Sequence, residues 1–216
     1  PIKKNRPIAS GEIQKSKALI LAVILLAVTA TLSLSFPQKV LIALTSYLTI
    51  NLLYSLWLKH VVIIDIFLIA SLYLIRIFAG GKLWDIYISH WLMLCTFFLA
   101  LFLISAKRRA EFCQQDENTN STRKVIKSYN KIFLDHMLTI TTTSSLVGYS
   151  LYVVNAEQPY FLYSVIFVAF GLFRYLYVVC QYNIGQFPEK VIFTDPWIFS
   201  SIALWGTYSL IVLYVI

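Results

Sequence analysis

Residues 18–36 read ALILAVILLAVTATLSLSF, an uncharged apolar stretch, and six further stretches of similar length and largely apolar composition follow it along the chain. A bilayer core requires about 20 apolar residues for each helical span, and a helix pairs all of its backbone groups within the span. The chain is 59% hydrophobic and 13% charged, which excludes an ordinary soluble domain. We therefore predict an all-α, polytopic transmembrane helical bundle. The predicted spans are 18–36, 40–58, 61–79, 86–105, 133–154, 160–181 and 196–216.

The basic residues fall mainly in alternate gaps between these spans. Fourteen of the 18 Lys and Arg residues lie in gaps that share one side of the membrane, whereas Lys39 and Lys82 lie in the opposite gaps. Excess Lys and Arg marks the cytoplasmic side, so we predict a multi-pass protein of the cell membrane with its active site facing the cytoplasm. Because the net charge of +8 is carried by membrane-facing loops, nucleic-acid binding is a weak interpretation.

Several ionisable side chains lie within or at the ends of the predicted spans, where charge is costly. Asp65 lies about one helical turn into its span, deep enough to need a partner. Asp135 opens another span on the same side of the membrane. Arg174 begins a polar stripe with Tyr177 and Gln181. Arg76 lies near the outer end of its span and is best explained by snorkelling toward the interface.

The predicted loop 106–132 opens with the stretch A-K-R-R-A-E-F, residues 106–112. If it is helical, Lys107 and Glu111 share a face. A solvated loop that sets the topology explains these charges, and so does a site for a pyrophosphate and its divalent cation. Arginine binds phosphate oxygens bidentately, and Mg²⁺ prefers one or two carboxylates plus substrate phosphates. The sequence contains no Walker loop, no G-x-S-x-G and no cysteine pair at metal-binding spacing.

Four groups of residues resemble the UbiA-type intramembrane prenyltransferase superfamily. Residues 1–11, P-I-K-K-N-R-P-I-A-S-G, are similar to its P-x-K-x-x-R-P-x-x-x-G stretch, and residues 54–59, Y-S-L-W-L-K, to its Y-S-x-x-L-K pattern. Residues 107–111, K-R-R-A-E, resemble the S-K-R-R-x-E loop of the decaprenyl-phosphate phosphoribosyltransferase branch. The triplets F-L-D at 133–135 and F-R-Y at 173–175 also resemble that branch.

The resemblance implies nine transmembrane helices around a central cavity that opens to the cytoplasm. It also implies that the P-x-K-x-x-R-P stretch directly follows a first Asp-rich, magnesium-binding motif. Since the chain begins at Pro1 without Met, we expect lost residues before it, and residues 1–216 would form a single UbiA-like domain without its N-terminal spans and that motif. The seven spans agree with this expectation.

The reaction implied by the resemblance is transfer of 5-phosphoribose from phosphoribosyl pyrophosphate to a polyprenyl phosphate, with Mg²⁺ as cofactor. The expected catalytic residues are Tyr54, Lys59 and Asp65. Asp65 and Glu111 are candidates for holding the metal, whose main motif would precede Pro1. We expect Lys59→Ala and Arg108→Ala each to remove most turnover and to leave the fold intact. The expected substrate-binding residues are Lys3, Arg6, Lys107, Arg108, Arg109, Glu111, Asp135 and Arg174.

Two alternatives stay open. Another branch of the superfamily would transfer a polyprenyl group from its pyrophosphate to an aromatic or lipid-precursor acceptor. Its second Asp-rich motif, D-x-x-x-D, is missing from 106–132, where Asp116 and Glu117 have no acidic partner at that spacing. A non-enzymatic membrane transporter is the other alternative, but the spans show no internal repeat and no paired broken helices.

Overall fold

The computed structural model describes residues 7–8, 10–113 and 124–215. Within these residues it is all-helical, and seven helical segments are long and apolar enough to cross a membrane. Both the fold class and the seven predicted spans are thereby confirmed. The helices are α1 (Lys15–Ser33), α2 (Gln38–Leu56), α3 (Ile64–Leu83), α4 (His90–Cys113), α5 (Lys131–Val154), α6 (Ser164–Tyr182), α7 (Pro188–Thr194) and α8 (Pro196–Tyr214).

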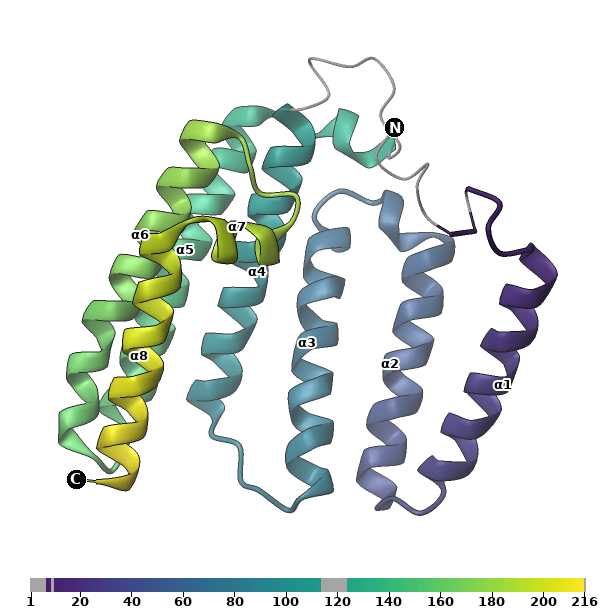
Figure 1. Ribbon diagram of the computed structural model, residues 1–216, viewed down its shortest axis with the longest axis horizontal. Helices are drawn as coiled ribbons and strands as arrows, with labels where there is room; N and C mark the ends of the chain where they lie inside the picture. Colours follow the sequence, from purple (N-terminus) through teal and green to yellow (C-terminus); the bar gives the residue numbers. More distant parts are fainter. Residues whose placement is uncertain (1–6, 9, 114–123, 216) are drawn as a thin grey trace.

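Consecutive long helices run antiparallel, and from α2 onward they pack mainly on their neighbours in the sequence. Helices α1 to α4 stand in a row, and α5, α6 and α8 gather beyond α4 (Figure 1). Helix α4 packs against both α3 and α5, whereas α1 lies at the edge of the row and contains no buried residue. The buried core therefore lies between α3 and α8.

The last turns of α2, α4 and α6 and the first turns of α3 and α5 lie at one end of the bundle (Figure 1). We call this the basic end, because it carries Lys59 and the charged end of α4. The short 3₁₀ turn η1 (Leu58–His60) lies between α2 and α3 and η2 (Lys124–Ser128) between α4 and α5, and the two turns contact each other. This contact brings the segment before α3 against the segment before α5.

The structure corrects two boundaries at this end. Helix α4 continues to Cys113, so residues 107–111 are helical and do not belong to a loop. Nothing in A-K-R-R-A-E-F stops a helix, since Ala, Lys, Arg and Glu all favour one. The predicted gap 182–195 contains the short helix α7, which begins with Pro188 in its first turn and lies crosswise to the long helices (Figure 1).

Candidate functional site at the basic end

The side chain of Arg108 joins two carboxylates at the end of α4. Its Nε donates to Asp65 Oδ2 on α3 at 2.8 Å, and its Nη1 donates to Glu111 Oε2 one turn further along α4 at 2.5 Å. Arg108 is 1% exposed and Asp65 is fully buried. Asp65 therefore has the partner that its depth required, and the pair fixes α3 against α4.

The second oxygen of Asp65 is bound by a residue that the sequence did not single out. Tyr129, just before α5, donates its hydroxyl to Asp65 Oδ1 at 2.7 Å, and the oxygen of that hydroxyl accepts from the Ile63 N–H at 2.8 Å. Burial and the bond to Asp65 raise the pKa of Tyr129 above its ordinary value, so the phenol stays protonated and keeps donating.

Ile63 lies in strained backbone immediately before α3. Its φ is 69° and its ψ −47°, and Ile64 N donates to Val62 O at 2.8 Å, which closes a three-residue γ-turn. This turn is rare, and a positive φ is an outlier for a β-branched residue. Such strain costs about 1–3 kcal/mol and persists only where neighbouring contacts enforce it. The Tyr129 hydroxyl supplies one such contact and so helps to hold η1 in place.

Tyr129→Phe tests this role. The substitution removes a donor from Asp65 and an acceptor from the Ile63 N–H, so we expect unfolding free energy to fall by about 1–3 kcal/mol. Amide hydrogen exchange across 58–64 should also accelerate. Tyr149→Phe is the matched control, because that buried hydroxyl bonds Ser164 and Trp205 far from η1. Equal exchange across 58–64 in the two variants would contradict the role of Tyr129.

Two lysines of the basic end, Lys59 and Lys107, differ from Arg108 in having no ion pair with any described residue. Lys59 in η1 and Lys107 on α4 are both half-buried, and no salt bridge involves either within the described chain. Tyr54, near the end of α2, lies within electrostatic range of the Arg108 guanidinium. These two lysines therefore bring charge that no described carboxylate neutralises close to the Arg108 network.

Arg109 follows Arg108 in the sequence but turns to the other side of α4. Its Nε donates to Asp135 on α5, and its Nη1 donates to Val179 O and Asn183 Oδ1 at 2.9 Å each. These bonds join α4 to α5 and α6. Arg109 and Asp135 thus tie these helices together, and the expectation that they bind substrate stays a prediction.

The loop after α6 lies directly on this part of α4. A Cβ added to Gly185 would stand 2.9 Å from Ala106 O and 3.3 Å from Ala110 Cβ, so only glycine permits the approach. Ala106 and Ala110 are both fully buried. The stretch A-K-R-R-A-E thus uses its alanines for close packing and its arginines for ties to different helices.

Arg174 is paired away from the Arg108 cluster. Its guanidinium binds Asp195 through Nε at 3.1 Å and Nη2 at 2.8 Å, and these bonds lower the pKa of Asp195 below its ordinary value. Asp195 also caps α8 by accepting from Trp197 N and Ile198 N at 3.0 Å each. Arg174 therefore fixes the start of α8 to α6.

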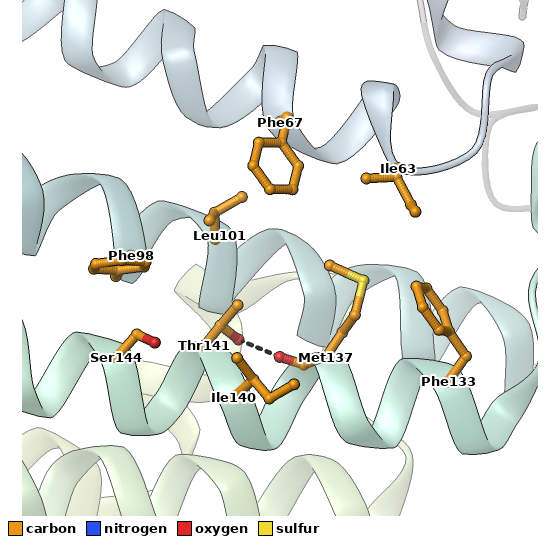
Figure 2. Close-up of a pocket in the computed structure, with 9 residues that line it drawn as sticks. All are labelled: Ile63, Phe67, Phe98, Leu101, Phe133, Met137, Ile140, Thr141 and Ser144. Carbon is orange, nitrogen blue, oxygen red and sulfur yellow. Dashed lines mark hydrogen bonds between the residues drawn. The ribbon is translucent and has the colours of Figure 1, made fainter.

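An apolar groove runs from the basic end toward the middle of the bundle, between α3, α4 and α5 (Figure 2). Its volume is about 300 Å³. The Thr141 hydroxyl on its wall is already bonded to Met137 O at 2.8 Å. The groove reaches Ile63, and its wall residue Phe133 stacks on Tyr129 with ring centroids 6.0 Å apart. The end of the groove nearest the basic end therefore adjoins the Asp65 network. The lining residues are Ile63, Phe67, Phe98, Leu101, Phe133, Met137, Ile140, Thr141 and Ser144.

The expected magnesium ligands do not form a metal site by themselves. Asp65 and Glu111 both bind Arg108, so a guanidinium lies where a shared cation would have to lie. Within the described residues, no three His, Cys, Asp or Glu side chains are grouped to hold a metal ion. Mg²⁺ demands near-octahedral oxygen coordination, which this pair does not supply.

The expected site residues thus separate into groups. Tyr54, Asp65, Arg108 and Glu111 come together at the basic end. Lys59 and Lys107 lie at the same end without a described ion pair. Arg109 is paired with Asp135 on the other side of α4, and Arg174 with Asp195. Lys3 and Arg6 lie outside the described residues. Of the residues missed, Asp195 could have been found, since Asp before Pro is typical of a helix start. Tyr129 carries no comparable signal.

Comparisons with known proteins agree with this architecture. The sequence model of the UbiA prenyltransferase family matches residues 1–193. The chain is 32% identical over 158 residues to a decaprenyl-phosphate phosphoribosyltransferase of Mycolicibacterium smegmatis, covering 73% of the chain and 50% of that protein. Proteins with the same name from Mycobacterium tuberculosis and Corynebacterium glutamicum are 29% and 30% identical, over 90% of the chain and 65% and 61% of their own lengths. The chain thus spans about half to two thirds of these relatives.

Proposed function

The chain belongs to the UbiA prenyltransferase family, and on that basis we propose that it transfers 5-phosphoribose from phosphoribosyl pyrophosphate to a polyprenyl phosphate. The names of its relatives support this reaction over prenyl transfer. The missing D-x-x-x-D motif in 106–132 favours the same choice.

The observation that carries the proposal is the junction of the apolar groove with the basic end. Ile63 and Phe133 line the part of the groove nearest the basic end, and both contact Tyr129, which binds Asp65. An isoprenoid tail lying in the groove would place its phosphate beside this network. The groove follows α5 from Phe133 to Ser144, about 16 Å at 1.5 Å per residue, so it accommodates the first part of a long tail.

In the proposed reaction a phosphate oxygen of the lipid forms a bond to C1 of the ribose. The bond from C1 to the pyrophosphate oxygen breaks with oxocarbenium character, and its electron pair leaves with the pyrophosphate. Fixed cations aimed at this developing charge lower the barrier. Lys59 and Lys107 are suited to that task, because no described carboxylate neutralises either of them. Tyr54 would orient the leaving group.

Asp65 and Arg108 have a different part in this proposal. Arg108 Nε and Nη1 are engaged by Asp65 and Glu111, so Arg108 mainly positions α3 and η1 relative to α4. Magnesium stays a prediction from the family resemblance, because the described carboxylates do not fit it. Among the described side chains, Lys59, Lys107 and Tyr54 are the ones we assign to the leaving group.

The test is an assay with two substrate pairs. Membranes containing the full chain receive radiolabelled phosphoribosyl pyrophosphate with polyprenyl phosphate, or polyprenyl pyrophosphate with a labelled aromatic acceptor. We expect lipid-soluble label only in the first pair. Label only in the second pair would replace phosphoribosyl transfer by prenyl transfer, and label in neither would remove the proposed activity from this chain.

We further propose that the basic end faces the cytoplasm of the cell membrane, because Lys and Arg gather there. In a cysteine-free background, Ser128→Cys at the basic end and Glu157→Cys at the opposite end are both exposed positions. An impermeant maleimide added to intact cells should label Glu157→Cys alone. Labelling of Ser128→Cys from outside would invert the orientation.

A further inference from the structure

Arg76 lies inside α3, seven residues before its last residue Leu83, and is held by two tyrosines. Its Nη2 donates to the Tyr47 hydroxyl on α2. The guanidinium carbon lies 5.1 Å from the centre of the Tyr47 ring and 5.7 Å from that of Tyr73. These contacts fix the charge within the span, where an ionisable residue is costly and commonly functional.

The direction of this side chain contradicts the expected snorkelling. Helical side chains lean toward the N-terminus of their helix, and α3 begins at the basic end. Arg76 contacts Tyr73, which lies one turn closer to Asp65 than Arg76 itself. Tyr47 lies nine residues inside α2, far from the interface. The guanidinium therefore points toward the basic end and away from the nearer end of α3.

Arg76 has no anionic partner among the residues that the structure describes, since it forms none of their ion pairs. It is also exposed on the surface of this chain, so a ligand can reach it. Tyr47, Asn51 and Tyr54 follow one another at i, i+4 and i+7, which places them on one face of α2. This polar face leads from Arg76 to Tyr54, which lies near Arg108.

We propose that Arg76 and Tyr47 form an intramembrane binding site for a phosphate monoester. Arginine is suited to phosphate oxygens, and the phenol holds the guanidinium in place. The inference rests on the proposed function, whose two substrates each carry a phosphate monoester: the 5-phosphate of phosphoribosyl pyrophosphate and the head of the polyprenyl phosphate. Arg76 follows Asp65 by 11 residues on α3, which corresponds to about 16 Å along the helix axis. Its side chain leans toward Asp65 and shortens this distance.

Binding is tested without turnover, by the thermal stabilisation of the purified full chain. Ribose 5-phosphate represents one source of the monoester and dodecyl phosphate the other. We expect one of them to stabilise the wild type, and Arg76→Gln to weaken its binding roughly ten- to a hundredfold, as for a lost charge-assisted hydrogen bond. Arg76→Lys should recover part of this affinity. Lys82→Gln is the control, because that cation lies over Phe78 at the end of the same helix and should change nothing.

Kinetics then identify which phosphate is bound in the reaction. Arg76→Gln could raise the KM for phosphoribosyl pyrophosphate but not the KM for ribose 1-pyrophosphate, the analogue that lacks the 5-phosphate. This result assigns the site to the phosphate of the sugar. A rise confined to polyprenyl phosphate assigns it to the lipid, whose phosphate would then lie at Arg76 and not beside Asp65. Tyr47→Phe keeps the ring and should raise the same KM by a smaller factor. It replaces Arg76→Gln as the test if that variant fails to fold. The proposal is overturned if neither probe binds through Arg76 and neither KM rises, whereas probe binding without any transfer would overturn the proposed reaction alone.

Discussion

Arg108→Ala should destabilise the protein more than any other single substitution at the basic end. It would leave the Asp65 carboxylate fully buried beside only the Tyr129 hydroxyl, and removing one partner of a buried ion pair costs about 3–5 kcal/mol. Denaturant unfolding in mixed micelles measures this loss. The expectation from sequence that Arg108→Ala leaves the fold intact is therefore not supported by the position of this side chain.

A double variant separates charge from structure. Arg108→Met with Asp65→Asn removes the two buried charges together, keeps an acceptor for Tyr129 and fills similar space, so most of the stability should return. Glu111 loses its partner in this variant, but its side chain is 17% exposed and reaches solvent. Activity should stay low, because the charges that position α3 and η1 are gone. If Arg108→Ala unfolds at the same denaturant concentration as the wild type, Asp65 is not buried as the structure has it.

Lys59→Ala should have the opposite profile, with loss of turnover and little loss of stability. No described residue forms an ion pair with Lys59, so its removal leaves no buried charge behind. If the ammonium binds the leaving pyrophosphate mainly in the transition state, its loss costs about 1.5–3 kcal/mol, roughly ten- to more than a hundredfold in kcat/KM. The measurement is phosphoribosyl transfer beside an unfolding curve of the same preparation.

Lys39→Ala provides the matched control, since Lys39 is an exposed lysine at the opposite end of the bundle. It should leave turnover unchanged, and Lys59→Arg should retain part of it. Lys107→Ala is expected to follow Lys59→Ala. Near-normal turnover in both lysine variants would mean that these cations set the topology and do not bind the leaving group.

Most of the fold could be predicted from local composition. The cost of placing polar groups in hydrocarbon acts on each segment separately, so hydropathy and length were sufficient to find all seven spans. The same reasoning showed that Asp65 needs a partner. It did not find the end of α4, because the charged run after Ser105 reads as a loop by hydropathy but contains strong helix formers.

The partners within the site could not be read in this way. Arg108 and Arg109 are adjacent in the sequence, but about 100° separates successive residues around a helix. One therefore meets Asp65 on α3, 43 residues away, and the other meets Asp135 on α5. Tyr129 completes the network from a loop with no distinguishing motif.

The sequence by itself therefore determined the membrane class, the spans and the end at which basic residues gather, because these follow from the transfer of each segment into the bilayer. Only the tertiary structure decided which cations are neutralised and which stay available, and that Arg76 points toward the basic end. The physical reason is that pairing depends on the rotation and depth of each helix against its neighbours. Rotation and depth depend on packing between distant segments, and local composition does not determine them.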